Sequence, residues 1–268
     1  MSALSSIPRR VKIKLKKSIS SADATVAQFG ECIIQFFGFT EKGYGNVGWR
    51  HENDELTLFG LEKGSTCLPH KVVVIKHASL CPMLHLDKSE FENLPAEVKD
   101  RGVNIGVAIL LTSTDNHVLI TRRSGHMRTF PGVWVPPGGH IESGETLFEA
   151  GARELREETG LVLESVPHHL LGLWESVYPH KLEMGGPSRQ HVVVYLSVKS
   201  HLPWRKLADR VKVRFEIKQR PRLNRARTLS IDFSWNLQKR TQPCGYRSPS
   251  WRRYRRDAPV TSCHTWCT

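Results

Sequence analysis

Residues 139–161 read GHIESGETLFEAGARELREETGL, and this stretch carries most of what the sequence says about fold and function. Thr146, followed by Glu149 three residues later, forms a capping-box pattern that marks the start of a helix. Gly160 is the residue type that most readily adopts the left-handed conformation at the end of a helix. We therefore predict a helix over residues 147–159.

Three carboxylates of this predicted helix share one face. At 100° per residue, Glu154, Glu157 and Glu158 fall within a sector of about 100°. Like charges one turn apart repel, so they destabilise an isolated helix unless a cation lies between them. Carboxylate oxygens without His or Cys suit Mg²⁺ or Mn²⁺, and Mg²⁺ commonly completes its shell with substrate phosphate oxygens. The face therefore predicts a metal site for a diphosphate substrate, with a solvated acidic surface as the alternative.

The spacing of the constrained residues follows a recognisable pattern. It reads G-x5-E-x7-R-E-U-x-E-E-x-G-U, where U is a bulky aliphatic residue, and all nine constrained positions are present. This pattern resembles the Nudix box, and residues 101–200 resemble Nudix hydrolases. The resemblance implies an α/β fold, an α/β/α sandwich around a mixed sheet. It also implies hydrolysis of a nucleoside diphosphate linked to another moiety, with Mg²⁺ or Mn²⁺ as cofactor.

The resemblance also assigns roles to individual acids. Glu154, Glu157 and Glu158 match the metal-binding positions of the family, and Glu157 and Glu158 are candidate catalytic residues as well. The general base in the family is either a helix glutamate or an acid from a later loop. Glu175 and Glu183 are the later candidates in this chain, and we expect Glu175 to be the one used.

The other box residues are expected to bind substrate or to shape the loop before the helix: Gly139, Glu145, Arg153 and Gly160. Arg153 is expected to hold a carboxylate or the 138–145 loop through a bidentate bond. Glu145 has two interpretations. It is either a metal ligand or an acid favoured by the positive end of the helix dipole.

Sequence outside the box bears on the substrate. The run RGVNIGVAILL at 101–111 and the region before it are most similar to Nudix members that cleave the m7GpppX cap of RNA. Capped RNA is therefore the expected substrate. Residues 119–139 are similar to coenzyme A pyrophosphatases, so a coenzyme A or dinucleotide substrate is an alternative. Arg122 and Arg123 either meet a substrate phosphate or lie at the surface.

The chain divides into three regions. Residues 1–100 mix short apolar runs with Gly-rich turns, which indicates a small β-rich module. In residues 101–200, apolar runs predict five strands, at 103–111, 117–122, 133–135, 170–175 and 191–198. Residues 201–268 show no sustained periodicity, which predicts a basic, low-order tail.

The net charge is concentrated in that tail. The 268-residue chain carries +13, and residues 201–268 hold 17 Lys and Arg against four Asp and Glu. Such a tail predicts nonspecific, salt-sensitive contact with RNA phosphates, or a disordered segment without that role. The run 204–211 is at most a two-turn helix, so the closing layer of the fold is predicted to be incomplete. A non-catalytic RNA-binding protein is therefore the alternative to an enzyme.

The compartment is predicted from the first residues. Residues 1–17 lack the apolar core of a secretory signal, and residues 11–16 alternate like an edge strand. We expect a cytosolic protein, with a mitochondrial presequence as the alternative. No stretch approaches 18 uncharged apolar residues, so no transmembrane helix and no membrane partner are expected. The six cysteines show no framework spacing, and no oligomeric state is predicted.

Overall fold

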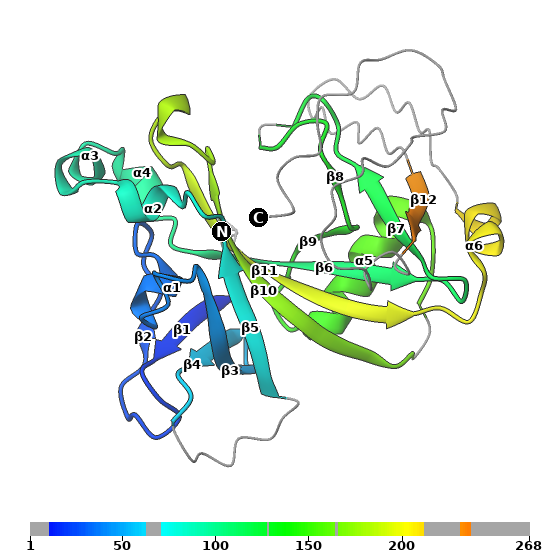
Figure 1. Ribbon diagram of the computed structural model, residues 1–268, viewed down its shortest axis with the longest axis horizontal. Helices are drawn as coiled ribbons and strands as arrows, with labels where there is room; N and C mark the ends of the chain where they lie inside the picture. Colours follow the sequence, from blue (N-terminus) through cyan, green and yellow to red (C-terminus); the bar gives the residue numbers. More distant parts are fainter. Residues whose placement is uncertain (1–10, 63–70, 128, 164–165, 212–230, 237–268) are drawn as a thin grey trace, which may run out of the picture.

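A computed structural model describes residues 11–62, 71–127, 129–163, 166–211 and 231–236. The described strands form one mixed sheet (Figure 1). They are β1 (Lys12–Lys16), β2 (Thr25–Val26), β3 (Tyr44–Glu52), β4 (Glu55–Phe59), β5 (Val72–His77), β6 (Asn104–Thr112), β7 (His117–Arg122), β8 (Trp134–Val135), β9 (Gly138–His140), β10 (His168–Tyr178), β11 (Arg189–Lys199) and β12 (Ile231–Asn236). All five strands expected over residues 101–200 are present, with ends shifted by at most three residues.

The sheet runs without interruption from the N-terminal region into the region of the box. Its order is β12-β7-β6-β11-β10-β5-β3-β4-β1-β2, with β8 beside β7 and β9 beside β6. Strand β5 pairs in parallel with β10, and β11 pairs in parallel with β6. Figure 1 shows strands β1–β5 on one side of the molecule and β6–β9 on the other, with β10 and β11 running between them.

Both regions also contribute to one hydrophobic core. Ile33 and Ile75 from the N-terminal region are fully buried, as are Ile109 and Leu155 from the region of the box. These residues belong to the same cluster of buried apolar side chains. The expected boundary near residue 100 therefore separates two stretches of sequence that share a sheet and a core.

Helix α5 (Leu147–Thr159) has the bounds predicted from the sequence. The Thr146 side chain accepts a hydrogen bond from the Glu149 N–H, and the Glu149 carboxylate accepts one from the Thr146 N–H. Gly160 ends the helix at φ 76°. The helix packs closely on the sheet at Gly151, where a Cβ atom would lie 2.8 Å from the Ile109 side chain.

The remaining described helices are short. They are α1 (Ile33–Phe36), α2 (Pro82–His85), α3 (Lys88–Glu92), α4 (Ala96–Lys99), α6 (Trp204–Arg210) and the 3-10 turn η2 (Leu182–Met184). In the described part of the chain, no helix is both long and apolar enough to cross a bilayer.

Residues 201–211 and 231–236 contain more structure than the sequence analysis predicts. Helix α6 is the two-turn segment expected there. It contacts the turn between β6 and β7, where the Trp204 N–H donates to Asp115 at 2.9 Å. Strand β12 pairs antiparallel with β7 and was not expected. The rest of the basic tail, residues 212–230 and 237–268, lies outside the described residues.

Candidate metal and diphosphate site

Gly139 and Glu154 meet at the base of the site. Gly139 lies on β9, which pairs with the buried strand β6, and Glu154 is a 6% exposed residue of α5. A Cβ atom on Gly139 would collide with the Glu154 carboxylate. Any other residue at position 139 would therefore push that carboxylate aside, which explains why glycine stands at the first position of the box.

Arg153 connects the helix to the loop before it. Its Nε donates to Glu145 Oε1 at 2.6 Å and its Nη2 to Glu145 Oε2 at 2.9 Å, which is the bidentate bond expected from the sequence. A further bond runs from Nη2 to the His140 carbonyl at 2.9 Å. The Arg153 guanidinium, followed by the hydrogen bond from the Glu142 N–H, holds the pKa of Glu145 below its usual value. Both Glu145 oxygens are thus engaged by protein donors, which favours a loop-holding role.

The same guanidinium reaches the acids of the helix. Arg153 Nη1 lies 3.2 Å from Glu154 Oε1 and 3.6 Å from Glu157 Oε1. Glu157 is half exposed, and Glu158, one residue further on, is partly buried. Arg153 therefore lies between two of the three predicted acids, the buried Glu154 and the solvent-facing Glu157.

Asp54 supports this loop and was not identified from the sequence. It lies in the turn between β3 and β4 at φ 60°, and its carboxylate accepts from the Gly144 N–H at 2.7 Å and from the Ser143 hydroxyl. The turn-forming pair Asn53-Asp54 indicates only a turn. Its contact with residues 90 positions later depends on the sheet, so no local signal could have revealed it.

The donor set of the α5 face fits a hard divalent cation. It consists of carboxylate oxygens from Glu154, Glu157 and Glu158 on consecutive turns of one helix. Because Gly139 has no side chain, the Glu154 carboxylate can occupy the space beside β9. Oxygen ligands of this kind match Mg²⁺ or Mn²⁺.

Comparison with known proteins agrees with this geometry. A sequence model of the NUDIX domain matches residues 102–217. These residues are a Nudix domain. The m7GpppN-mRNA hydrolase NUDT17 of Danio rerio is 43% identical over 194 residues, which cover 72% of this chain and 62% of that protein. The protein of the same name from Xenopus laevis is 47% identical, over 67% of this chain and 62% of that protein. The human one is 43% identical, over 52% and 43%. This chain therefore spans less than two thirds of the length of these curated relatives.

Glu175 lies on β10 of the Nudix domain but not among the acids of α5. It is 1% exposed, and its carboxylate accepts from the Ile33 N–H at 3.0 Å, the Ile34 N–H at 3.3 Å and Gln190 Nε2 at 2.8 Å. Its oxygens are thus directed at the start of α1. These contacts argue against the expectation that Glu175 is the general base, because a base must reach an attacking water. Glu183, the other candidate, is exposed in η2.

Arg122 and Arg123 of the Nudix domain brace the loop between β7 and β8. Arg122 Nε donates to the Gly132 carbonyl at 3.1 Å, and Arg123 Nε donates to the Phe130 carbonyl at 3.2 Å. The Phe130 ring in turn packs edge-to-face on Tyr178, with centroids 5.1 Å apart. Both arginines therefore have a structural role in shaping this loop.

Two histidines lie at the edge of the site. The rings of His140 on β9 and His191 on β11 have centroids 6.1 Å apart. Burial, reinforced by His140 and by Arg189 and Arg123, lowers the pKa of His191 to about 4. His191 is therefore neutral at physiological pH.

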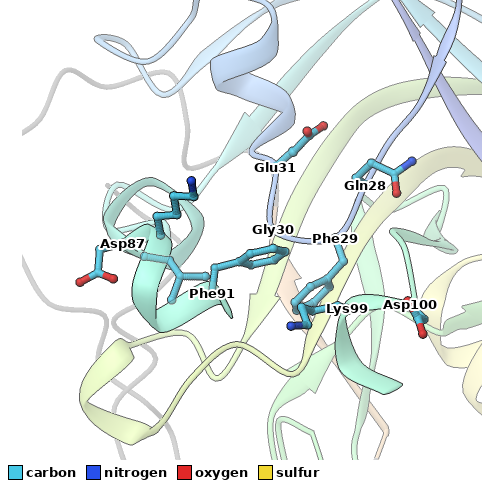
Figure 2. Close-up of a pocket in the computed structure, with 10 residues that line it drawn as sticks. Gln28, Phe29, Gly30, Glu31, Asp87, Phe91, Lys99 and Asp100 are labelled. Carbon is cyan, nitrogen blue, oxygen red and sulfur yellow. The ribbon is translucent and has the colours of Figure 1, made fainter. Parts of the chain in front are cut away.

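An open groove of about 690 Å³ lies beside the start of α1 (Figure 2). Phe29 and Phe91 line it, and Lys99 Nζ lies 5.9 Å from the centroid of the Phe91 ring. The Gly30 N–H at its wall donates to Gln190 Oε1 at 3.1 Å. Its lining mixes acids and bases and is open to solvent, so the groove is not assigned a ligand.

Proposed function

We propose that this chain is a metal-dependent pyrophosphohydrolase that cleaves nucleoside diphosphates linked to another moiety, with the m7GpppN cap of RNA as its substrate. One observation carries the hydrolase proposal: the Glu154 carboxylate, the half-exposed Glu157 and Glu158 follow one face of α5 beside Gly139. The cap is supported by the name of the relatives, m7GpppN-mRNA hydrolase. Their agreement with this chain includes the N-terminal region as well as the box, because it extends over 194 residues.

Glu154, Glu157 and Glu158 are the residues that would hold the ion, Mg²⁺ or Mn²⁺. The chemistry that such an ion supplies when bound is neutralisation of the bridging phosphate oxygens and a lower pKa of the attacking water. Arg153 holds the loop before α5 close to the helix acids through its bonds to Glu145 and Glu154. It therefore acts as a positioning residue.

The proton acceptor in this proposal is a helix acid. Glu157 is half exposed, so its carboxylate can take a proton from a water at the edge of the site. Glu183 is the second candidate because it is exposed on the segment between β10 and β11. Exchange of each for Gln separates the two, because only the base supports the acidic limb of the pH–rate profile.

The basic tail is proposed to add nonspecific contact with RNA. Residues 237–268 hold seven Lys and Arg against one Asp. Removal of these residues is expected to weaken RNA binding at low salt and to flatten its salt dependence, because fewer counterions are released. Cleavage of short capped substrates at saturating concentration is expected to stay the same.

The assay that tests the hydrolase uses the full chain with capped RNA, NADH and coenzyme A, each in Mg²⁺ or Mn²⁺. Glu158→Gln is expected to lose at least about 100-fold in cleavage rate, because loss of a direct ligand exceeds the roughly 10–100-fold effect of an outer-shell residue. Glu41→Gln, an exposed acid outside the Nudix domain, is the matched control and is expected to keep the wild-type rate.

Three outcomes of this assay are informative. Cleavage of capped RNA that disappears in Glu158→Gln supports the proposal. Cleavage of NADH or coenzyme A in preference to capped RNA retains the hydrolase but overturns the cap as substrate. Salt-sensitive RNA binding without any cleavage overturns the enzyme and supports a non-catalytic RNA-binding protein.

A further inference from the structure

A second cluster of potential metal ligands lies away from the acids of α5. It consists of Cys32 before α1, His77 at the end of β5 and Cys81 before α2. All three residues are buried, at 3%, 2% and 2% exposure. Their ligand atoms lie within 4.8 Å of one another. Two sulfurs and an imidazole nitrogen suit zinc, whereas the oxygen set on α5 suits a harder ion.

The separation of Cys32 and His77 matches that of neighbouring ligands in a tetrahedral zinc shell. Zn–S bonds of about 2.3 Å and Zn–N or Zn–O bonds of about 2.0–2.2 Å place neighbouring ligand atoms roughly 3.5–3.8 Å apart. Cys32 Sγ lies 3.7 Å from His77 Nδ1 and 3.5 Å from Glu175 Oε2. The carboxylate of Glu175 thus borders the three-residue cluster on the side of Cys32 and is the buried acid nearest to hand as a fourth ligand.

The backbone presents these side chains in a fixed arrangement. Cys32 and Cys81 each stand in extended conformation as the N-cap residue of a short helix. His77 is held by its backbone N–H, which donates to the Gly43 carbonyl at 3.2 Å. The cluster is thus assembled from two segments of the N-terminal region, Cys32 before α1 and the stretch from His77 to Cys81.

An outer shell orients Glu175. Its Oε1 atom accepts from the Ile33 N–H at 3.0 Å and from Gln190 Nε2 at 2.8 Å, while Oε2 accepts from the Ile34 N–H at 3.3 Å and faces Cys32. The same amide of Gln190 also donates to the Glu31 carbonyl at 2.8 Å. Such second contacts to a ligating carboxylate hold it in position for a metal.

Charge points in the same direction. Glu175 is buried, and among the described residues no Lys or Arg forms an ion pair with it. Its charge is met by hydrogen bonds from neutral donors, so a cation nearby would stabilise it further. A dication that displaces the two thiol protons to solvent would supply that cation.

We propose that Cys32, His77, Cys81 and Glu175 bind one structural zinc ion. The site closes the tetrahedron with protein ligands, so it has no open position for catalysis. It ties α1, β5 and α2 of the N-terminal region to β10 of the Nudix domain, next to the β5–β10 pairing. Zinc binding therefore stabilises the junction of the two regions.

Metal content of the full chain is the direct test. Protein produced with zinc and dialysed against metal-free buffer is expected to retain about one zinc per chain by elemental analysis. The double variant Cys32→Ser with Cys81→Ser is expected to lose it. The control is Cys263→Ser with Cys267→Ser, which removes two cysteines outside the cluster and is expected to keep the zinc.

Cobalt substitution keeps the test independent of variants that fail to fold. Addition of Co²⁺ to zinc-free wild-type chain is expected to produce an intense thiolate-to-cobalt absorption, saturating at one equivalent. The single variant Cys81→Ser is expected to retain about half of that intensity, because one of two thiolates remains. Magnesium is expected to leave the spectrum unchanged.

The proposal is overturned by any of three results. These are a zinc-free wild-type chain that gives no thiolate–cobalt band, zinc that persists in the Cys32/Cys81 double variant, or thiol counting that shows Cys32 and Cys81 joined as a disulfide in protein isolated from cells. None of these measurements depends on cleavage of a nucleotide. The zinc site and the proposed hydrolase can therefore fail separately.

Discussion

Helix α5 and strand β10 both place acidic side chains in the Nudix domain, but in opposite surroundings. On α5 the acids lie along a surface that grades from the 6% exposed Glu154 to the half-exposed Glu157, beside an arginine. On β10, Glu175 is almost completely buried, and its hydrogen-bond donors in the described part of the chain are neutral groups. The first arrangement presents charge to a ligand from solvent. The second holds segments of the chain together, so an acid in a hydrolase domain can serve architecture alone.

The largest expected effect concerns stability at Glu175. Exchange for Ala leaves the Ile33 and Ile34 amides without their acceptor, while Gln190 keeps the Glu31 carbonyl, and this costs roughly 2–6 kcal/mol of unfolding free energy at about 1–3 per buried amide. Urea denaturation measures the loss. Exchange of the exposed Glu183 for Ala is the control and is expected to change stability little.

The milder Glu175→Gln variant addresses catalysis at the same position. We expect its cleavage rate, corrected for folded fraction, to stay within about tenfold of wild type. A fall of roughly 10²–10⁴ with unchanged stability would be the signature of a general base. That result would remove the contrast between the two acids.

The next effect concerns the positioning of the α5 acids. Arg153→Lys is expected to lower kcat/KM by about 10–100-fold, because lysine cannot make the bidentate bond to Glu145 and outer-shell contacts to a metal site have effects of that size. The exposed Arg156→Lys is the matched control. Steady-state kinetics over a range of Mn²⁺ concentrations would show whether the loss is recovered at high metal. Equal rates in the two variants would refute the positioning role.

A smaller effect follows from His191, which lies beside the site at the start of β11. Its pKa falls from 6.5 to about 4 on folding, so the unfolded chain binds more protons between those values. Stability is therefore lost as pH falls through this window, by about 1 kcal/mol between pH 7 and pH 5.5. Denaturation midpoints at both pH values measure this loss. His191→Gln is expected to reduce the slope, whereas the exposed His201→Gln is expected to keep it.

The smallest effect concerns the start of α5. Thr146→Ala removes the acceptor for the Glu149 N–H and is expected to cost about 1 kcal/mol or less of unfolding free energy, since the cap is exposed. Thermal denaturation measures it. Thr146→Ser retains the hydroxyl and should restore stability. A loss of cleavage much larger than the loss of stability would mean that the cap also places the acids.

Local patterns explain which features the sequence analysis identified. The bounds of α5, its capping box and its left-handed glycine depend on residues within one or two turns, and all were predicted. The bidentate bond of Arg153 also joins residues eight positions apart in one motif. Helical spacing is a short-range property, so it can be read from one sequence.

Features that depend on strand order were missed. Asp54 reaches Gly144 across 90 residues, and Glu175 reaches Ile33 across 142. Contacts across such sequence separations are not encoded in a local pattern. The expectation that Glu175 is a base rested only on its position in the sequence after the box. The unexpected strand β12 has the same cause, because it forms by pairing with β7.

The parallel pairing of β5 with β10 has a consequence for how such a chain can be divided. A polypeptide that began at residue 101 would retain all nine positions of the box, yet the β10 residues 173–175 would have no strand beside them on that side. Open backbone of this kind recruits strands from other molecules. Proteolysis or gene rearrangement that separates the halves is thus expected to yield self-association rather than an autonomous enzyme.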